Sequence, residues 1–355
     1  MAKNLKHIFR TELILQRKRG KKVSRNTIKK DTNGKYADYT RIYSDKSYAT
    51  HLGRSKQFAD YCKSQNIKNL KQITPEFAQK YLIYQRNRGL SASTIGSDAL
   101  MINHILIGSG IWKEQQKLQK AKISGMPKRS MLISKQREKS LTSLEWRQRY
   151  PNKYEKYRAQ IDTIRAFGFR RRELVGGTSR KGKDGLGNLS LYKFKDETLR
   201  AITQGKGGKV RWTVCRKDMQ AEMEQFYSSI IRPEAFRPRS KADFQRNLKE
   251  NKPFFHPFSH QVPAHIFRAE YAQNMIQELA NHHYSGRRSY FYYKKIKSET
   301  TGKFQYIKTT RYHDLNSLYQ VGEYRASYGA FYQLTDYLGH NRIDVLNAYL
   351  GIGRG

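Results

Sequence analysis

The chain has 355 residues, a length that predicts two domains rather than one. It carries 70 Lys and Arg against 29 Asp and Glu, and this formal net charge of +41 predicts a polyanionic partner, because a compact chain with such a charge repels itself. The chain is 37% hydrophobic and has no apolar run near the roughly 18 residues of a spanning helix, which excludes a membrane protein. It has two cysteines, far apart in the sequence, which excludes disulfide-rich and zinc-finger proteins. We therefore expect a cytoplasmic protein that contacts nucleic acid.

Basic residues are distributed along the whole chain rather than gathered in one tail. This distribution is typical of proteins that wrap a duplex and contact phosphates from many elements. The 25 tyrosines fit duplex binding through their hydroxyls, but composition alone leaves single-strand or RNA binding by aromatic stacking open. The candidate DNA-binding residues come from two dense clusters: Arg17, Lys18, Arg19, Lys21, Lys22, Arg287, Arg288, Lys294 and Lys295.

The N-terminal segment is basic and polar with little periodicity, which predicts an arm that is flexible until it meets DNA. Helical periodicity follows, and Thr74 before Pro75 is typical of a helix start. Ser91 or Ser93 can cap a further helix. The predicted order is a basic arm at 1–42, a helical domain at 43–112, a linker at 113–140 and a second domain at 141–355.

The second domain combines helices with a small sheet. After a helix that includes Ile161–Phe169, two alternating segments flank a Gly-Lys-Gly-Gly turn at Gly205–Gly208, which predicts a hairpin. A basic, aromatic segment at Arg287–Tyr312, with a Thr-Thr-Gly turn, predicts a second hairpin among further helices. We therefore expect a mainly α fold with a small antiparallel β-sheet.

The sequence lacks the P-loop, dinucleotide-binding, HExxH and zinc-deaminase motifs, which argues against nucleotide hydrolysis and zinc chemistry. It offers instead an ordered set of cationic side chains and one late tyrosine. The set comprises Arg170 and Glu173 in GFRRREL, Lys206 at a hairpin tip, His265 and Arg268 three apart on a helix, and His340 in LGH with Tyr349 nine residues later.

These motifs, in this order, resemble the tyrosine recombinase (phage integrase) family over about residues 45–355. The resemblance implies a helical core-binding domain followed by a mixed α/β catalytic domain. About 70 residues separate Arg268 from Leu338, more than the family commonly has, which implies an insertion at about 284–322. Ala269 stands where the family usually shows a second His.

The resemblance implies that Tyr349 attacks a scissile phosphate, forms a 3′-phosphotyrosyl link and releases a 5′-hydroxyl, with no metal or cofactor. A phenol, with a pKa of about 10, is a better source of a nucleophile than serine, and arginines clamp phosphate bidentately at any relevant pH. The implied roles are phosphate clamps for Arg170 and Arg268, an acid for the leaving oxygen (Lys206), a base or phosphate ligand (His265), a phosphate ligand (His340) and an orienting carboxylate (Glu173).

The implied partner is double-stranded DNA, with four protomers on two duplexes and an accessory DNA-bending or directionality factor as a candidate. A bacterial, nucleoid-associated integrase of a mobile element is the favoured role, because the basic N-terminus exceeds the two-domain minimum. Two alternatives stay open: a type IB-like topoisomerase, and a non-catalytic DNA-binding architectural protein of the same fold. Single residues also have structural interpretations, since Arg170 could lie on the surface, Lys209 could replace Lys206, and Tyr349 could be a core aromatic.

Overall fold

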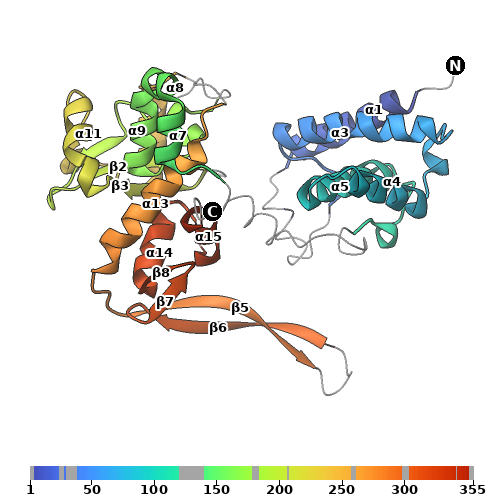
Figure 1. The fold of residues 1–355 in the computed structure, drawn as a ribbon. Coiled ribbons are helices and arrows are strands. Elements are labelled where there is room, and N and C mark those ends of the chain that lie inside the picture. The colour runs from blue at the N-terminus through green and yellow to red at the C-terminus, as the bar shows by residue number, and fades with distance from the viewer. Residues whose placement is uncertain are drawn as a thin grey trace. The chain divides into compact units, whose positions relative to one another are not determined.

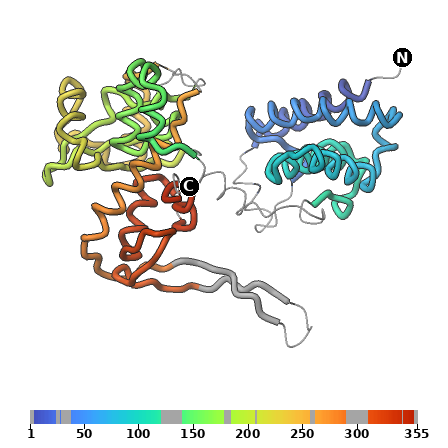
Figure 2. The backbone as a smooth tube through the Cα atoms, viewed as in Figure 1, coloured from blue at the N-terminus to red at the C-terminus, as the bar shows by residue number. Residues whose placement is uncertain are grey.

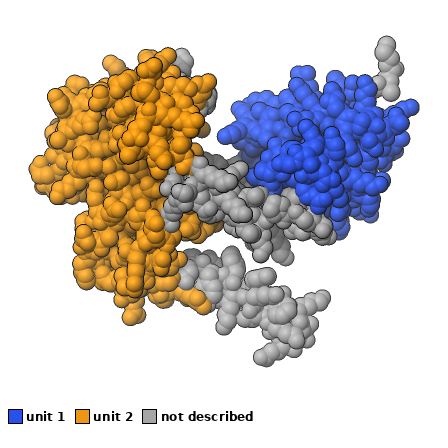
Figure 3. Space-filling view, viewed as in Figure 1, with its two compact units in different colours: residues 1–133 blue, residues 134–355 orange. Residues whose placement is uncertain are grey.

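The computed structural model describes residues 4–23, 28, 38–119, 140–177, 184–205, 208–256, 261–297, 304–340 and 342–351, with the backbone alone at 290–297 and 304–309 (Figure 2). The chain divides into two compact units, unit 1 (residues 1–133) and unit 2 (residues 134–355) (Figure 3). Within these described ranges, no helix is both long and apolar enough to span a bilayer. In the same ranges, no group of three or more His, Cys, Asp or Glu side chains is placed to hold a metal ion.

Unit 1 is a helical bundle (Figure 1). Both predicted helix starts are confirmed: Thr74 Oγ1 accepts from Phe77 N at 3.1 Å with Pro75 in the first turn, and Ser91 Oγ accepts from Thr94 N at 3.2 Å. The α-helices described in this unit are α1 (Leu5–Lys21), α3 (Asp45–Ser64), α4 (Pro75–Asn87) and α5 (Ala92–Gly108).

The predicted flexible arm is wrong for its first half, because α1 packs into the core of unit 1. Phe9 and Leu13 are fully buried against α3 and α5. Gly20 lets the following segment approach closely, since a Cβ there would lie 2.2 Å from the Ile42 carbonyl oxygen. Apolar residues spaced four apart face the core and the basic residues lie between them, so the helix is amphipathic although its composition is basic.

The predicted linker also begins inside unit 1. Trp112 is buried and its Nε1 donates to Ile73 O at 2.9 Å. Leu118 N donates to Asn103 Oδ1 at 2.9 Å, and Asn103 Nδ2 donates back to Leu118 O at 3.0 Å. The chain therefore stays packed on α5 beyond residue 113. Most of the rest of the predicted linker, residues 120–139, lies outside the described residues.

Two histidines are buried side by side in unit 1. His51 on α3 is 5% exposed, and its ring centroid lies 5.1 Å from that of His104 on α5. His104 Nδ1 contacts Gln16 Oε1 at 3.0 Å and Tyr39 O at 2.9 Å, whereas His51 Nδ1 has no partner in the described part of the chain. Burial, helped by repulsion from His104 and Arg54, lowers the pKa of His51 to about 4. Burial also lowers the pKa of His104.

We expect unit 1 to lose stability as the pH falls from about 6.5 toward 4. In that window the unfolded chain binds a proton on His51 that the folded chain does not bind, so the free energy of unfolding falls by about 2 kcal/mol between pH 7 and pH 5. Amide hydrogen exchange in α3 and α5 measures this loss. His51→Gln should reduce it, and the exposed His7 on α1 provides the control His7→Gln, which should not. An unchanged acid sensitivity in His51→Gln would contradict the assignment.

Unit 2 is mainly helical around a small sheet, which confirms the expected fold class. The strand order is β3-β2-β1-β4, with β1, β2 and β3 antiparallel and β4 parallel to β1. The strands are β1 (Leu191–Lys193), β2 (Leu199–Gln204), β3 (Val210–Val214), β4 (Arg232–Pro233), β5 (Arg287–Lys297), β6 (Phe304–Asp314), β7 (Leu318–Val321) and β8 (Tyr324–Ser327). The α-helices are α7 (Ser143–Arg149), α8 (Pro151–Lys156), α9 (Arg158–Phe167), α10 (Arg171–Val175), α11 (Gln220–Phe226), α12 (Lys241–Glu250), α13 (Ala264–Ala280), α14 (Tyr328–Tyr337) and α15 (Asn347–Leu350).

Both predicted hairpins are confirmed. In β2–β3, Gln204 lies opposite Val210, and Gly205 N donates to Lys209 O at 2.8 Å. In β5–β6, pairing runs from Arg287 opposite Asp314 up to the last residues of β5, and the ribbon extends away from the rest of unit 2 (Figure 1). The strands β5, β6 and β7 lie inside the predicted insertion at 284–322, and the Thr-Thr-Gly turn falls outside the described residues.

Helix α13 lies between two parts of the core of unit 2 (Figure 1). On one side, Phe267 is buried in a cluster with Phe167 of α9 and residues of the sheet. On the other side, Met275 and Ile276 belong to a second cluster with α14 and α15. Arg268 follows Phe267 directly, so the helix carries it to the border between the two clusters.

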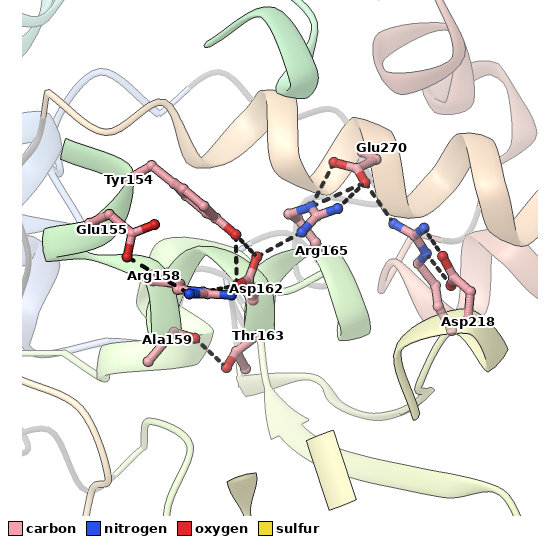
Figure 4. A network of polar contacts seen from close by, with 10 residues as sticks. Tyr154, Glu155, Arg158, Ala159, Asp162, Thr163, Arg165, Asp218 and Glu270 are labelled. Carbon is pink, nitrogen blue, oxygen red and sulfur yellow. Dashed lines mark hydrogen bonds and ion pairs between the residues drawn. The ribbon is translucent and has the colours of Figure 1, made fainter. Parts of the chain in front are cut away.

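A polar network joins α9 to α13 (Figure 4). Arg165 of α9 donates to both carboxylate oxygens of Glu270 at 2.8–3.1 Å and to Asp162 at 2.7 Å. Arg216, just after β3, also donates to Glu270 at 3.0 Å. Burial raises the pKa of Glu270, but hydrogen bonds from its partners outweigh burial and hold that pKa at about 2. Since Glu270 lies on α13, this network holds α13 against α9 and the end of β3.

Candidate active site

The first part of the site is the turn between α9 and α10. Helix α9 ends at Gly168, whose φ is +64°, and a Cβ there would lie 2.3 Å from the Tyr271 ring, so the turn requires glycine. Arg170 is the N-cap of α10. Glu173 Oε2 accepts from Arg170 N at 2.8 Å, and Oε1 accepts from Arg170 Nη1 at 2.7 Å. Glu173 therefore fixes both the backbone and the guanidinium of Arg170.

Glu173 is buried and contacts three guanidinium groups. Besides Arg170, Arg211 Nη2 lies 2.7 Å and Arg268 Nη1 lies 3.4 Å from Glu173 Oε2. Burial raises the pKa of Glu173, but Arg211, Arg268 and Arg170 outweigh it and hold that pKa at about 2. The carboxylate is ionised at neutral pH, and the four groups together keep an excess of positive charge.

Arg268 is fully buried on α13. It donates to the Gly168 and Leu338 carbonyl oxygens, so it ties the α9–α10 turn to the end of α14. Burial lowers the pKa of Arg268 to about 10, which still leaves the guanidinium charged at neutral pH. Its Nε has no partner in the described part of the chain. One buried donor is therefore without an acceptor among the described residues.

His340 is positioned by the end of α14. Gly339 has a φ of +67°, and His340 N donates to Thr335 O at 2.7 Å, closing the helix. A Cβ at Gly339 would lie 2.7 Å from Arg211 Cδ, which is too close, and 3.6 Å from Arg170 Nη1, so the backbone before His340 presses against Arg211. Only glycine satisfies both the backbone angle and this close approach.

Tyr349 completes the site from α15. Its hydroxyl lies 3.1 Å from His340 Nε2, and its ring lies over the Arg268 guanidinium, with 5.2 Å from Cζ to the ring centroid. Arg170 Nη2 lies 3.0 Å from the same His340 Nε2. A guanidinium can only donate, so His340 Nε2 is an acceptor and the ring is neutral. Burial, with repulsion from Arg268, Arg170 and Arg211, lowers the pKa of His340 to about 3, which agrees with a neutral ring.

The structure brings together Arg170, Glu173, Arg268, His340 and Tyr349, five of the residues singled out by sequence. The contacts above do not include His265, which is exposed on the first turn of α13. Lys206 lies outside the described residues. The preceding Gly205 lies next to the site, since a Cβ there would be 3.1 Å from Glu173 Oε1. The alternative Lys209 is exposed.

Arg211 is the site residue that sequence reasoning missed. It is 5% exposed on β3, where the burial pattern places Arg211 and Thr213 inward and Trp212 outward. The signal available in the sequence is the alternation of VRWTV, which puts a charged residue on the same face as a buried one. Its contact with Glu173 depends on the folded turn at Gly168 and could not be derived from spacing.

The candidate DNA-binding residues lie on two elements. Arg17 is half-buried on α1, where it pairs with Asp45 at 2.8 Å and lies over the Tyr48 ring. Lys18, Arg19, Lys21 and Lys22 are exposed at the end of α1. Arg287 and Arg288 are exposed at the start of β5, and the side chains of Lys294 and Lys295 lie outside the description.

The sequence matches no protein-family model and no curated protein. The chain is similar over nearly its whole length to solved structures of an integrase and of a site-specific recombinase. One is the Tn1549 transposon integrase in complex with transposon right end DNA, at 13% identity and a TM-score of 0.44, covering 98% of this chain and 95% of that chain. Another is the XerH site-specific recombinase bound to palindromic difH substrate in a post-cleavage complex, at 12% identity and a TM-score of 0.47, covering 98% and 93%.

Proposed function

We propose that this chain is a tyrosine recombinase that cuts and rejoins duplex DNA through a 3′-phosphotyrosyl intermediate. The observation that carries the proposal is the Tyr349 hydroxyl 3.1 Å from a neutral imidazole, His340, with its ring against a buried arginine, Arg268. A nucleophile, a base within hydrogen-bond reach and a group that orients the base are the parts that covalent catalysis needs. Here Arg170 orients the base at 3.0 Å.

The proposed reaction exchanges one phosphodiester for another. The Tyr349 oxygen attacks the phosphorus, its proton passes to His340 Nε2, and the bond from phosphorus to the 5′ oxygen breaks. Arg170 and Arg268 stabilise the negative charge on the non-bridging oxygens. Lys206 supplies the proton of the departing 5′-hydroxyl. A 5′-hydroxyl of a partner strand reverses the sequence, so the bond energy is conserved in the phosphotyrosine.

Substrate binding has to move Tyr349. Arg268 is fully buried and the Tyr349 ring lies over its guanidinium, so a phosphate reaches Arg268 only when the ring is displaced. His340 and Arg170 are more accessible and remain in place at the edge of the cluster. The arrangement is therefore a resting site in which the nucleophile covers a cation that it later shares with the phosphate.

The wider role follows from the same proposal. The partner is duplex DNA, contacted by unit 1, by the basic residues of α1 and by the start of β5. The proposal includes a working assembly of four protomers on two duplexes and an accessory DNA-bending or directionality factor. It also includes a role in the recombination of a bacterial mobile genetic element. The competing activities are supercoil relaxation by a type IB-like topoisomerase and DNA architecture without cleavage.

A nicked suicide duplex tests the chemistry. We expect wild-type protein to form a covalent adduct that resists SDS, and Tyr349→Phe to form none, because phenylalanine lacks the hydroxyl that would attack the phosphorus. Tyr337→Phe is the matched control, since the Tyr337 hydroxyl accepts from Gln333 at 2.6 Å rather than from the site and its loss should leave adduct formation intact. An architectural protein gives no adduct. Joining of two target sites, rather than relaxation of any plasmid, separates a recombinase from a topoisomerase.

A further inference from the structure

The buried arginine on β3 has no role in the reaction described so far. Arg211 is 5% exposed, and its Nη2 donates to Glu173 Oε2 at 2.7 Å. Its Nε and Nη1 have no partner in the described part of the chain. Burying a guanidinium with two unpaired donors costs free energy. Arg170 and Arg268 already neutralise Glu173, so charge balance alone does not require Arg211.

The packing of Arg211 links the two halves of the site. Strand pairing fixes its position, because Arg211 lies opposite Thr203 in the β2–β3 register. At one end its guanidinium holds the Glu173 carboxylate. Its Cδ and Nε face the backbone of Gly339, where a Cβ would lie 2.7 Å and 3.0 Å away. Arg211 thus contacts both the carboxylate that orients Arg170 and the residue that precedes His340.

We propose that Arg211 is a positioning residue for phosphodiester cleavage: it holds Glu173 between the two phosphate-clamping arginines and holds His340 against the Tyr349 hydroxyl. The inference rests on the proposed function and assigns Arg211 no contact with DNA. It acts through Glu173 and through the Gly339 backbone. Its loss therefore misplaces the base and a clamp together.

The charge of Arg211 also acts on His340. The charged and titratable groups that face His340 are Arg268, Arg170, Arg211, Glu173 and Tyr349. Burial is the main reason that the pKa of His340 is low, and the three arginines lower it further. Removing the charge of Arg211 removes one of these repulsions, so the pKa of His340 rises. A side chain that only fills space would not change this pKa.

The test compares Arg211→Gln with Arg211→Lys in the full chain. We expect Arg211→Gln to slow single-turnover adduct formation on a nicked duplex by roughly 10²-fold at neutral pH, because a displaced catalytic group costs about that much. The acid side of its pH–rate profile moves to higher pH. Arg211→Lys keeps the charge, so it restores the pH profile and recovers at least roughly ten-fold of the lost rate.

Arg216→Gln is the matched control, because Arg216 is an equally buried arginine in an ion pair near the end of β3. Glu270 keeps its bonds from Arg165, so the control should lose stability while its pH profile and its rate, within about three-fold, stay unchanged. Unaltered cleavage in Arg211→Gln overturns the inference. So does a slower rate with an unshifted pH profile, which indicates a structural role only.

A titration of His340 by NMR, without DNA, separates this inference from the proposed function. An upward shift of the His340 pKa in Arg211→Gln, absent in Arg211→Lys, supports the electrostatic link even if wild-type protein forms no adduct. If wild-type protein forms no Tyr349-dependent adduct, the proposed function fails on that result alone. If wild-type protein cleaves and neither Arg211 variant alters the rate or the titration, only the positioning role is lost.

Discussion

Arg268→Ala will lower covalent adduct formation by at least about 10³-fold, while affinity for duplex DNA stays within about three-fold of wild type. Arg268 is the fully buried cation beneath Tyr349, the proposed nucleophile, so in the proposed reaction its loss removes charge where the transition state develops it. Duplex affinity depends on many phosphate contacts, and the chain has 70 Lys and Arg to supply them. Single-turnover cleavage of a nicked duplex and fluorescence anisotropy at fixed salt measure the two quantities.

Arg268→Lys separates chemistry from folding. The alanine variant removes the Arg268 bonds to the Gly168 and Leu338 carbonyl oxygens and one of the three guanidinium groups around Glu173, which lowers stability as well as activity. Lysine keeps the charge but lacks the planar fork that reaches both carbonyl groups, so we expect it to stay roughly 10²-fold slower than wild type. A loss of duplex affinity equal to the loss of cleavage would refute the catalytic assignment of Arg268.

Gly339→Ala should slow cleavage by roughly 10²-fold or more without weakening duplex binding. A Cβ at this position lies 2.7 Å from Arg211 Cδ and 3.6 Å from Arg170 Nη1, so the methyl group displaces Arg211 and with it the turn that aims His340. The φ of +67° adds strain for any residue with a side chain. Single-turnover adduct formation measures the loss.

Gly286→Ala separates the effect of the steric clash with Arg211 from the effect of backbone strain. Gly286 lies in the same unit, has a φ of +93°, and has no atom within 4 Å of its Cβ position among the described residues. Both variants therefore carry backbone strain, but only Gly339→Ala pushes into Arg211. We expect similar falls in the melting temperature and a large loss of cleavage in Gly339→Ala alone. Equal cleavage by the two variants would show that the contact with Arg211 is unimportant.

Local signals in the sequence predicted several elements of the fold. The helix starts at Thr74 and Ser91 and the turn between β2 and β3 depend on residues next to one another, and each is confirmed. Helix α1 was missed because its apolar stripe is short and its composition is basic. The contacts that hold α1 in place join residues far apart in the chain: Phe9 and Leu13 pack against α3 and α5, and Ile42 approaches Gly20.

The candidate site shows the same difference between features set by neighbouring residues and features set by contacts far apart in the chain. The motifs around Arg170, Arg268 and Tyr349 predicted five residues that the structure brings together, and the Tyr349 hydroxyl lies 3.1 Å from His340 Nε2. Arg211 was missed because its place beside Glu173 depends on strand pairing and on the turn at Gly168. The predicted roles of Lys206 and His265 stay predictions.

Tyr349, the proposed nucleophile, lies on a single helical turn, α15, which has too few residues to be stable alone. Among the described contacts that anchor it are the burial of Leu350 and of the preceding Leu346, and a hydrogen bond from Gln273 Nε2 to Tyr349 O. Freeing two buried leucines costs about 3–6 kcal/mol. Two or three charge-assisted hydrogen bonds to a DNA backbone, at about 1.5–3 kcal/mol each, match that cost. The free energy of binding a target DNA can therefore offset the cost of releasing Tyr349 from its packed position, without hydrolysis of a nucleotide.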